Sequence, residues 1–408
     1  MVRPKLKQLL SIPVIVAALG YFVDIYDLLL FGIVRVASLR GIGVPEDQIF
    51  EKGIYLINVQ MIGLLIGGII WGIFGDKKGR LSVLFGSILL YSLANIANGF
   101  VTTVDQYAIL RFIAGIGLAG ELGAGITLVS EVLPKEVRGY GTTLVATLGM
   151  FGAVLAYFIS DMYDWRITYF IGGGLGIALL ITRISVYESG IFMDLKTKNV
   201  QRGNFFQLFT NFSRFKRYLS CILIGTPIWY VIGILVILSP EFGAELSLPE
   251  ALDGGKAVMF SYLGLALGDM SSGLISQWLK SRKKVVLIFI FLTAALIVLY
   301  VNTPVRTPGF VYFLTGCLGF GVGYWALFVT IAAEQFGTNL RATVTTTVPN
   351  FIRGTLPLLN FFFVQAKGQW GILNGALVVG AVTIVIALIA LSSIHETFSK
   401  DLNFVEQD

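Results

Sequence analysis

Apolar stretches of roughly 20 residues recur along nearly the whole chain, which is the length a helix needs to cross a hydrocarbon core about 30 Å thick. Short polar segments separate them. The pattern predicts an all-α membrane protein with twelve transmembrane helices in two sets of six. The expected spans are 12–36, 53–75, 81–101, 106–132, 139–160, 165–187, 217–239, 255–279, 285–301, 309–333, 343–366 and 370–394.

A polar and basic segment, residues 188–216, separates the two sets of helices. Its FFQLFTNFSRF stretch predicts an amphipathic helix at the membrane interface. We expect this segment to link two six-helix bundles, residues 1–187 and residues 217–394. Residues 395–408 would then form a cytoplasmic tail.

An internal repeat favours two pseudo-symmetric bundles. The stretch from Glu131 to Arg138 recurs as Glu334 to Arg341, 203 residues later, which is about half the chain. Parallel repeats of this kind place a substrate site between the halves, near the membrane midplane.

Composition narrows the class of protein. Only 13% of the 408 residues are charged and 56% are hydrophobic, whereas soluble proteins hold about 25% charged residues. The net charge of +6 does not indicate nucleic-acid binding, because the basic residues lie in short loops where topology accounts for them. Cys221 and Cys317 fall within spans and His395 is the single histidine, so we expect no disulfide framework, metal site or cofactor.

The distribution of Lys and Arg predicts the orientation. The basic clusters at Arg3 to Lys7, Lys77 to Arg80, Lys196 to Arg217 and Lys280 to Lys284 all fall on one side. Because cytoplasmic loops carry the excess of Lys and Arg, both termini are expected on the cytoplasmic side of the membrane. The expected membrane is a bacterial-type inner membrane. We expect a monomer whose partners are lipid, a small-molecule substrate and protons.

Two charges stand inside the fourth apolar span. Arg111 and Glu121 interrupt a glycine-rich run that extends from Tyr107 to Arg138. Intramembrane charge costs a few kcal/mol per residue even on lenient scales, so these side chains need partners or a watery cavity.

The motifs around this span resemble those of the major facilitator superfamily. The pattern R-x-x-x-G-x-G begins at Arg111, and S-E-x-x-P-x-x-x-R-G runs from Ser130 to Gly139. The run G-x-x-G-D-x-x-G-R from Gly72 to Arg80 is similar to the superfamily's loop between helices two and three. The resemblance is to the branch of sugar porters, proton-coupled metabolite symporters and organic-ion carriers, and it implies the major facilitator fold.

The loop motif predicts a cytoplasmic gate. Asp76 would contact a neighbouring helix end or Arg138, and this contact would break when the cytoplasmic side of the protein opens. A purely topogenic basic loop is the alternative, but it explains neither the aspartate nor the glycines. The expected gate residues are Gly72, Gly75, Asp76, Gly79, Arg80, Glu131, Arg138, Glu334 and Arg341.

The first span holds two carboxylates, Asp24 and Asp27, on neighbouring faces of one helix stripe. Helix rise places Asp27 and Arg111 at comparable depth, and the resemblance implies that they form a proton-coupling pair. A structural ion pair is the alternative. Asp24 is a further candidate for coupling, or a cavity-lining carboxylate without that role.

Candidate substrate residues come from both halves. A midplane arginine such as Arg353 suits an anionic group, although a buried pair with Glu334 or Asp269 is the alternative. Glu121 could bind a cationic group or only hydrogen-bond another helix. The aromatic candidates lie in the seventh and tenth spans, which line the cavity in the superfamily, unless they only pack helices. The predicted substrate residues are Glu121, Trp229, Tyr230, Tyr324, Trp325, Asn350 and Arg353.

Taken with the resemblance, the residues predict a secondary transporter that moves a small polar organic solute by alternating access with proton coupling. The alternatives are a uniporter, an exporter or a sugar:proton symporter, and a receptor or channel belongs to a different class. The fifth and seventh spans lack the glutamines of sugar porters, which disfavours a sugar. The sequence contains no phosphate-binding G-x-x-x-x-G-K-[ST] motif and no nucleophile–base cluster, so neither ATP drive nor an enzyme is expected.

Overall fold

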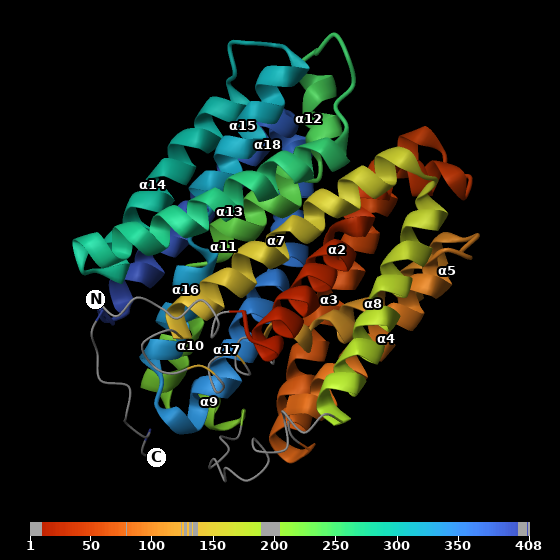
Figure 1. Ribbon diagram of the computed structural model, residues 1–408. Helices are drawn as coiled ribbons and strands as arrows, with labels where there is room; N and C mark the ends of the chain where they lie inside the picture. Colours follow the sequence, from red (N-terminus) through yellow and green to blue (C-terminus); the bar gives the residue numbers. More distant parts are fainter. Residues whose placement is uncertain are drawn as a thin grey trace.

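The structure is a computed structural model. It describes residues 10–78, 80–123, 125, 129, 133, 138–188, 205–398 and 406, and within these ranges it leaves out the side chains of 13, 75–78, 80–81, 138–140, 142–143, 185–188, 338–339 and 342. In the described part every regular element is a helix (Figure 1). The all-α prediction is therefore confirmed.

The N-terminal half is built from long apolar helices. They are α2 (Ile12–Gly41), α3 (Ile49–Lys78), α4 (Arg80–Asn98), α5 (Val104–Leu118), α7 (Arg138–Met162) and α8 (Trp165–Glu188), with a short 3₁₀ turn, η1 (Glu46–Gln48), before α3. Local sequence fixes where some of them start. Pro13 stands in the first turn of α2, and the Thr103 hydroxyl accepts a hydrogen bond from the Gln106 N–H at the start of α5.

The C-terminal half contains more and shorter pieces. They are α9 (Gln207–Thr210), α10 (Phe212–Leu223), α11 (Thr226–Tyr230), a π-helical turn η3 (Val231–Val236), α12 (Ser239–Glu245), α13 (Gly254–Leu279), α14 (Arg282–Val301), α15 (Pro308–Gly321), α16 (Trp325–Gln335), α17 (Thr338–Arg353) and α18 (Leu356–Ser393). Gly371, with φ 77° and ψ 168°, divides α18 into two helices. Only glycine adopts such a backbone readily.

Nine segments of the described residues are long and apolar enough to cross a membrane. One of them, Thr343–Ser393, contains the break at Gly371, and α4 is a shorter apolar helix. Within the described residues, four predicted spans are interrupted rather than continuous: the fourth, seventh, tenth and eleventh. The breaks follow sequence, because glycine or proline stands at each of them.

The interruptions of the fourth and tenth spans correspond to each other. The fourth breaks at Ala119–Gly120 and the tenth at Val322–Tyr324, and Ala119 and Val322 are 203 residues apart. This is the same offset as in the repeated Glu-to-Arg stretch. Both halves therefore interrupt the same helix at the same point.

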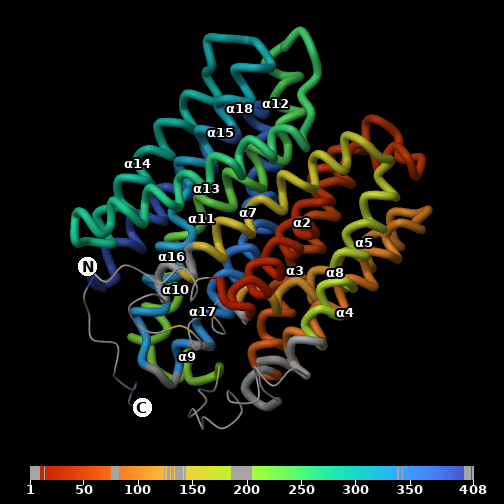
Figure 2. The backbone as a smooth tube through the Cα atoms, viewed as in Figure 1, coloured from red at the N-terminus to blue at the C-terminus, as the bar shows by residue number. Residues whose placement is uncertain are grey.

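Glycines bring helices into close contact within each half. A Cβ on Gly115 of α5 would collide with the Gln60 carbonyl oxygen of α3. A Cβ on Gly319 of α15 would likewise collide with the Ser261 carbonyl oxygen of α13. Between the halves, α7 packs along α13 and α3 packs along α17 (Figure 2). These two contacts enclose the region that holds the candidate site.

Candidate substrate site between the halves

A small cavity lies between the two halves of the molecule. Its volume is about 20 Å³, which is room for about one water molecule. A larger solute therefore needs the lining to move apart. The lining comes from α2, α7, α11, η3, α13, α16 and α17, and consists of Tyr21, Ile25, Met150, Ile228, Trp229, Ile232, Tyr262, Leu265, Trp325 and Arg353.

Helix breaks place the most polar and aromatic of these side chains. Arg353 is the last residue of α17, and Trp325 is the first residue of α16. Trp229 lies in α11, directly before the π-helical turn. Breaks and π-turns of this kind recur at functional sites, because they free backbone groups and redirect side chains into a cavity.

Arg353 faces a carboxylate of the opposite half. Its Nη2 atom lies 4.0 Å from an oxygen of Asp24, and the two side chains are 1% and 0% exposed. That separation is too long for a hydrogen bond, and neither Asp24 oxygen has a hydrogen-bond partner in the described part of the chain. The Arg353 Nη1 group donates only a long bond of 3.5 Å to the Asn350 side chain. Arg353 therefore retains hydrogen-bonding capacity for an anion.

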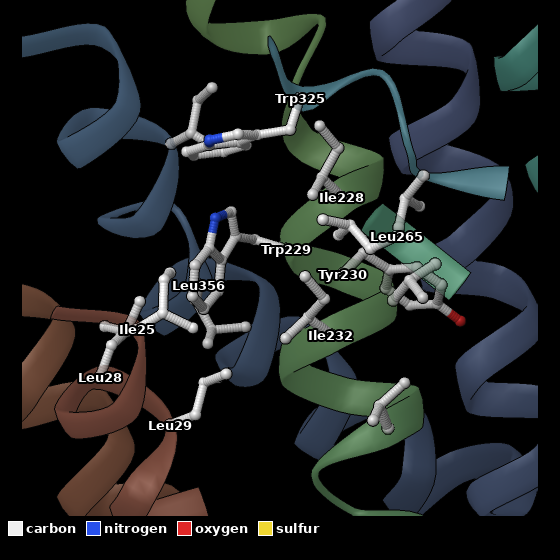
Figure 3. Packing of buried hydrophobic residues seen from close by; sticks show 14 of the residues in the cluster. Ile25, Leu28, Leu29, Ile228, Trp229, Tyr230, Ile232, Leu265, Trp325 and Leu356 are labelled. Carbon is white, nitrogen blue, oxygen red and sulfur yellow. The ribbon is translucent and has the colours of Figure 1, made fainter. Parts of the chain in front are cut away.

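Two indole rings flank the Arg353 guanidinium. Its central carbon lies 5.9 Å from the ring centre of Trp229 and 5.7 Å from that of Trp325, within the range of cation–π attraction. Figure 3 shows these two indoles facing the same space, with Ile228 beside them. The site thus combines one cation with flat apolar walls.

The two tyrosines beside these tryptophans point elsewhere. Tyr230 donates to the Ala376 carbonyl oxygen at 2.5 Å, and in Figure 3 its hydroxyl points away from Trp229. Tyr324 donates to the Ile224 carbonyl oxygen at 3.1 Å. Neither residue lines the cavity. Asn350 does not line it either, since its amide donates to the Ala119 carbonyl oxygen and joins α17 to the N-terminal half.

Asp27 and Arg111 lie buried inside the N-terminal half without forming a close pair. Both are 0% exposed, and no ion pair within 4.0 Å joins them among the described residues. Arg111 instead donates to the Asn95 side-chain oxygen at 2.6 Å and stacks over Tyr169 at 5.0 Å. The Asp27 carboxylate packs against Gly172 of α8.

Glu121 has a partner that the sequence analysis missed. Arg183 of α8 donates to both its oxygens, at 3.1 and 3.0 Å, and Ser87 of α4 donates to it at 3.1 Å. Glu121 is 2% exposed and does not line the cavity. The signal for this pair was present, because Arg183 stands late in the sixth apolar span, after a long run of uncharged residues.

Comparison with known proteins decides the family. The sequence profile described as Major Facilitator Superfamily matches residues 17–354. The chain belongs to the Major Facilitator Superfamily. The chain is 25% identical to a niacin transporter of Acinetobacter baylyi over 80% of each chain. It is also 25% identical to a gentisate transporter of Corynebacterium glutamicum, over 78% of this chain and 73% of the relative.

A third relative matches in part. A benzoate transport protein of Acinetobacter baylyi is 29% identical over 44% of this chain and 39% of its own. As a member of the superfamily, this chain is a transporter of small organic molecules rather than an enzyme.

Most of the superfamily's gate motif falls outside the described side chains. This holds for Gly75, Asp76, Gly79 and Arg80 and for Glu131 and Arg138. Gly72 is described and faces Thr347 of α17 across the contact between the halves.

The C-terminal copy of the Glu-to-Arg element is described. Glu334 pairs with Arg282 of α14 through two bonds of 2.6 and 2.8 Å, so it does not pair with Arg353. Arg341 donates to the Ala333 and Phe336 carbonyl oxygens. Asp269, the other suggested partner of Arg353, accepts from the Ala326 N–H at 3.0 Å near the start of α16.

A second contact between the halves lies at the end of the molecule where α2 finishes. Arg35 of α2 pairs with Glu241 of α12 at 2.7 Å, with side chains 1% and 20% exposed. Nearby, Asn360 of α18 donates to Asn58 of α3 at 2.7 Å. These contacts join the two halves at that end of the molecule.

Proposed function

We propose that this chain transports a small aromatic carboxylate, with Arg353 binding the carboxylate and Trp229 and Trp325 contacting the ring. The observation that carries this proposal is the Arg353 guanidinium, which lies buried between two indoles in a cavity shared by both halves. Arginine suits a planar carboxylate because its donors form a fork. The relatives support the same class, because niacin, gentisate and benzoate are aromatic carboxylates.

Asp24 competes with the substrate in this proposal. It is the anion that faces Arg353 in this structure. A substrate carboxylate would take its place, and Asp24 would then be left in a dry site without a cation. A carboxylate in that position binds a proton readily, so one proton would enter with each substrate anion. Asp27 and Arg111 form a second candidate for the same role.

Alternating access would open the cavity to each side in turn. The contacts of Arg35 with Glu241 and of Asn58 with Asn360 would close the outer side. The motif around Asp76 and Arg138 would close the inner side. We place both termini in the cytoplasm and the protein, as a monomer, in a bacterial-type inner membrane, because the basic loops lie on the side of the termini.

Reconstitution tests the proposal. Proteoliposomes that contain the protein should take up radiolabelled benzoate or nicotinate. A proton gradient directed into the vesicles, with the outside more acidic, should drive accumulation of the substrate above its outside concentration. Uptake that equilibrates without accumulation would favour a facilitative uniporter. The absence of any flux of aromatic carboxylates, in either direction, would contradict the proposed substrate class.

A further inference from the structure

Trp229 carries a buried donor that the protein leaves unused. The residue is 2% exposed, and its indole N–H has no hydrogen-bond partner among the described residues. Buried polar groups without a partner are rare in native proteins, so each one asks for an explanation. Because Trp229 lines the cavity, a bound molecule could supply the missing acceptor.

Three other aromatic side chains of the described part donate to backbone carbonyl oxygens away from the cavity. Trp71 donates its indole N–H to the Ile116 carbonyl oxygen at 2.6 Å. In the same segment as Trp229, Tyr230 reaches a carbonyl oxygen, and the Leu235 carbonyl oxygen accepts from Tyr300 at 3.1 Å. Trp229 alone among these four side chains keeps its donor toward the cavity.

Geometry separates this donor from the carboxylate site. Arg353 lies over the ring of Trp229, whereas an indole N–H points outward in the plane of its ring. Figure 3 shows the nitrogen edge of Trp229 directed toward Trp325, into the space between the two indoles. A ring whose carboxylate is held by Arg353 would therefore present a different edge to the Trp229 N–H.

We propose that the Trp229 N–H donates a hydrogen bond to an acceptor on the substrate ring, either a ring nitrogen or a ring-borne oxygen. The inference rests on the proposed transport of aromatic carboxylates. The cavity has room for about one water molecule, whose oxygen can accept from the Trp229 N–H when no substrate is bound. A substrate without an acceptor would displace that water and leave the donor unpaired, so it would bind more weakly.

Binding to the purified protein in nanodiscs tests this selectivity, with benzoate, nicotinate and 3-hydroxybenzoate as probes. The wild-type protein should bind one or both acceptor-bearing acids at least about 5-fold more tightly than benzoate, the effect of one net hydrogen bond. Trp229→Phe should remove this preference, because the affinity for the acceptor-bearing acids should fall several-fold more than the affinity for benzoate. Tyr300→Phe is the matched control, since it deletes a hydrogen bond in the same region outside the cavity, and it should keep the preference.

A second variant guards against misfolding. Incorporation of the benzothiophene analogue of tryptophan at position 229 keeps the bicyclic ring and deletes only the N–H, and it should also abolish the preference. Equal losses for all three probes in either variant would make Trp229 a packing residue and overturn the inference, as would a wild-type protein without preference. Failure of the wild-type protein to bind any of the three acids would instead overturn the proposed substrate class.

Discussion

The carboxylate of Asp24 lies 4.0 Å from the guanidinium of Arg353, although the two residues belong to opposite halves of the chain. Both charges are removed from water, where their mutual attraction is strong and the cost of separating them is high. No direct hydrogen bond joins them. The two halves therefore meet at a charge contact, and in the proposed function a substrate anion takes the place of Asp24 in it.

Replacing Asp24 by asparagine should separate exchange from coupling. Asp24→Asn mimics a permanently protonated carboxyl, so counterflow of substrate should persist while accumulation driven by a pH gradient is lost. Asp27→Asn, measured in parallel, tests the second candidate that the family resemblance favours. Full accumulation by Asp24→Asn together with loss in Asp27→Asn would move the coupling to Asp27. Full accumulation in both would exclude both carboxylates.

The pair of Arg35 and Glu241 should hold the outer side closed. Arg35→Gln removes one partner of a largely buried pair, so the outward-open state should become more populated. We expect several-fold faster labelling of a cysteine placed in the outer pathway. Arg40→Gln is the control, because Arg40 pairs with Glu46 at an exposed position where ion pairs contribute little. Equal labelling rates in both variants would remove the pair from gating.

Arg183 and Glu121 should contribute to stability rather than to substrate binding. Arg183→Gln leaves a buried carboxylate without its cation and should cost roughly 3–5 kcal/mol, seen as a marked fall in the melting temperature. Glu121→Gln keeps a group that can accept a hydrogen bond from Ser87. The affinity of this variant for substrate should therefore stay within about twofold of the wild-type value. A large loss of affinity in Glu121→Gln without destabilisation would return Glu121 to the substrate site.

Glu396 should make stability depend on acid pH. Partial burial acts to raise its pKa, but hydrogen bonds from the Ser281 hydroxyl and from the Phe398, Arg282 and Thr397 N–H groups outweigh burial and lower the pKa to about 2. A glutamate carboxyl in the unfolded chain has a pKa of about 4.3. Glu396 therefore stabilises the fold above that pH, and its contribution is lost as the pH falls toward about 2.

Melting of the wild-type protein and of Glu396→Gln across pH measures this contribution. The variant should melt at a lower temperature at pH 7, and the two curves should converge at strongly acid pH. A difference in melting temperature that stays constant with pH would show that the charge of Glu396 is not what stabilises the contact with α14.

Sequence periodicity was sufficient for the fold class, because the apolar stretches have the length of membrane spans. It did not locate the helix breaks within four spans, since a break such as Val322–Tyr324 leaves hydropathy unchanged. Glycine and proline marked the places, as Gly354 and Pro357 do beside Arg353. Only the packing of the helices in the folded protein shows which of these breaks lie beside the cavity.

The candidate site was predictable by residue type but not by partner. Arg353, Trp229 and Trp325 were singled out from the sequence, and all three line the cavity. Asp24 faces Arg353 only because the two halves, which are distant along the chain, pack against each other. Tyr230 and Tyr324 show the same limit, because rotation about the helix axis, rather than residue type, decides which aromatic faces the cavity.

The affinity of Arg353 variants for benzoate, measured in nanodiscs, tests the central claim most directly. Arg353→Lys keeps the charge but loses the fork, so binding should weaken about tenfold or more, and Arg353→Ala should abolish it. Neutral benzamide should bind poorly to the wild-type protein, while Arg183→Lys, a control outside the cavity lining, should keep benzoate affinity. Unchanged benzoate affinity in Arg353→Lys, combined with an Arg353→Ala variant that fails to fold, would contradict the account and make Arg353 a structural partner of Asp24.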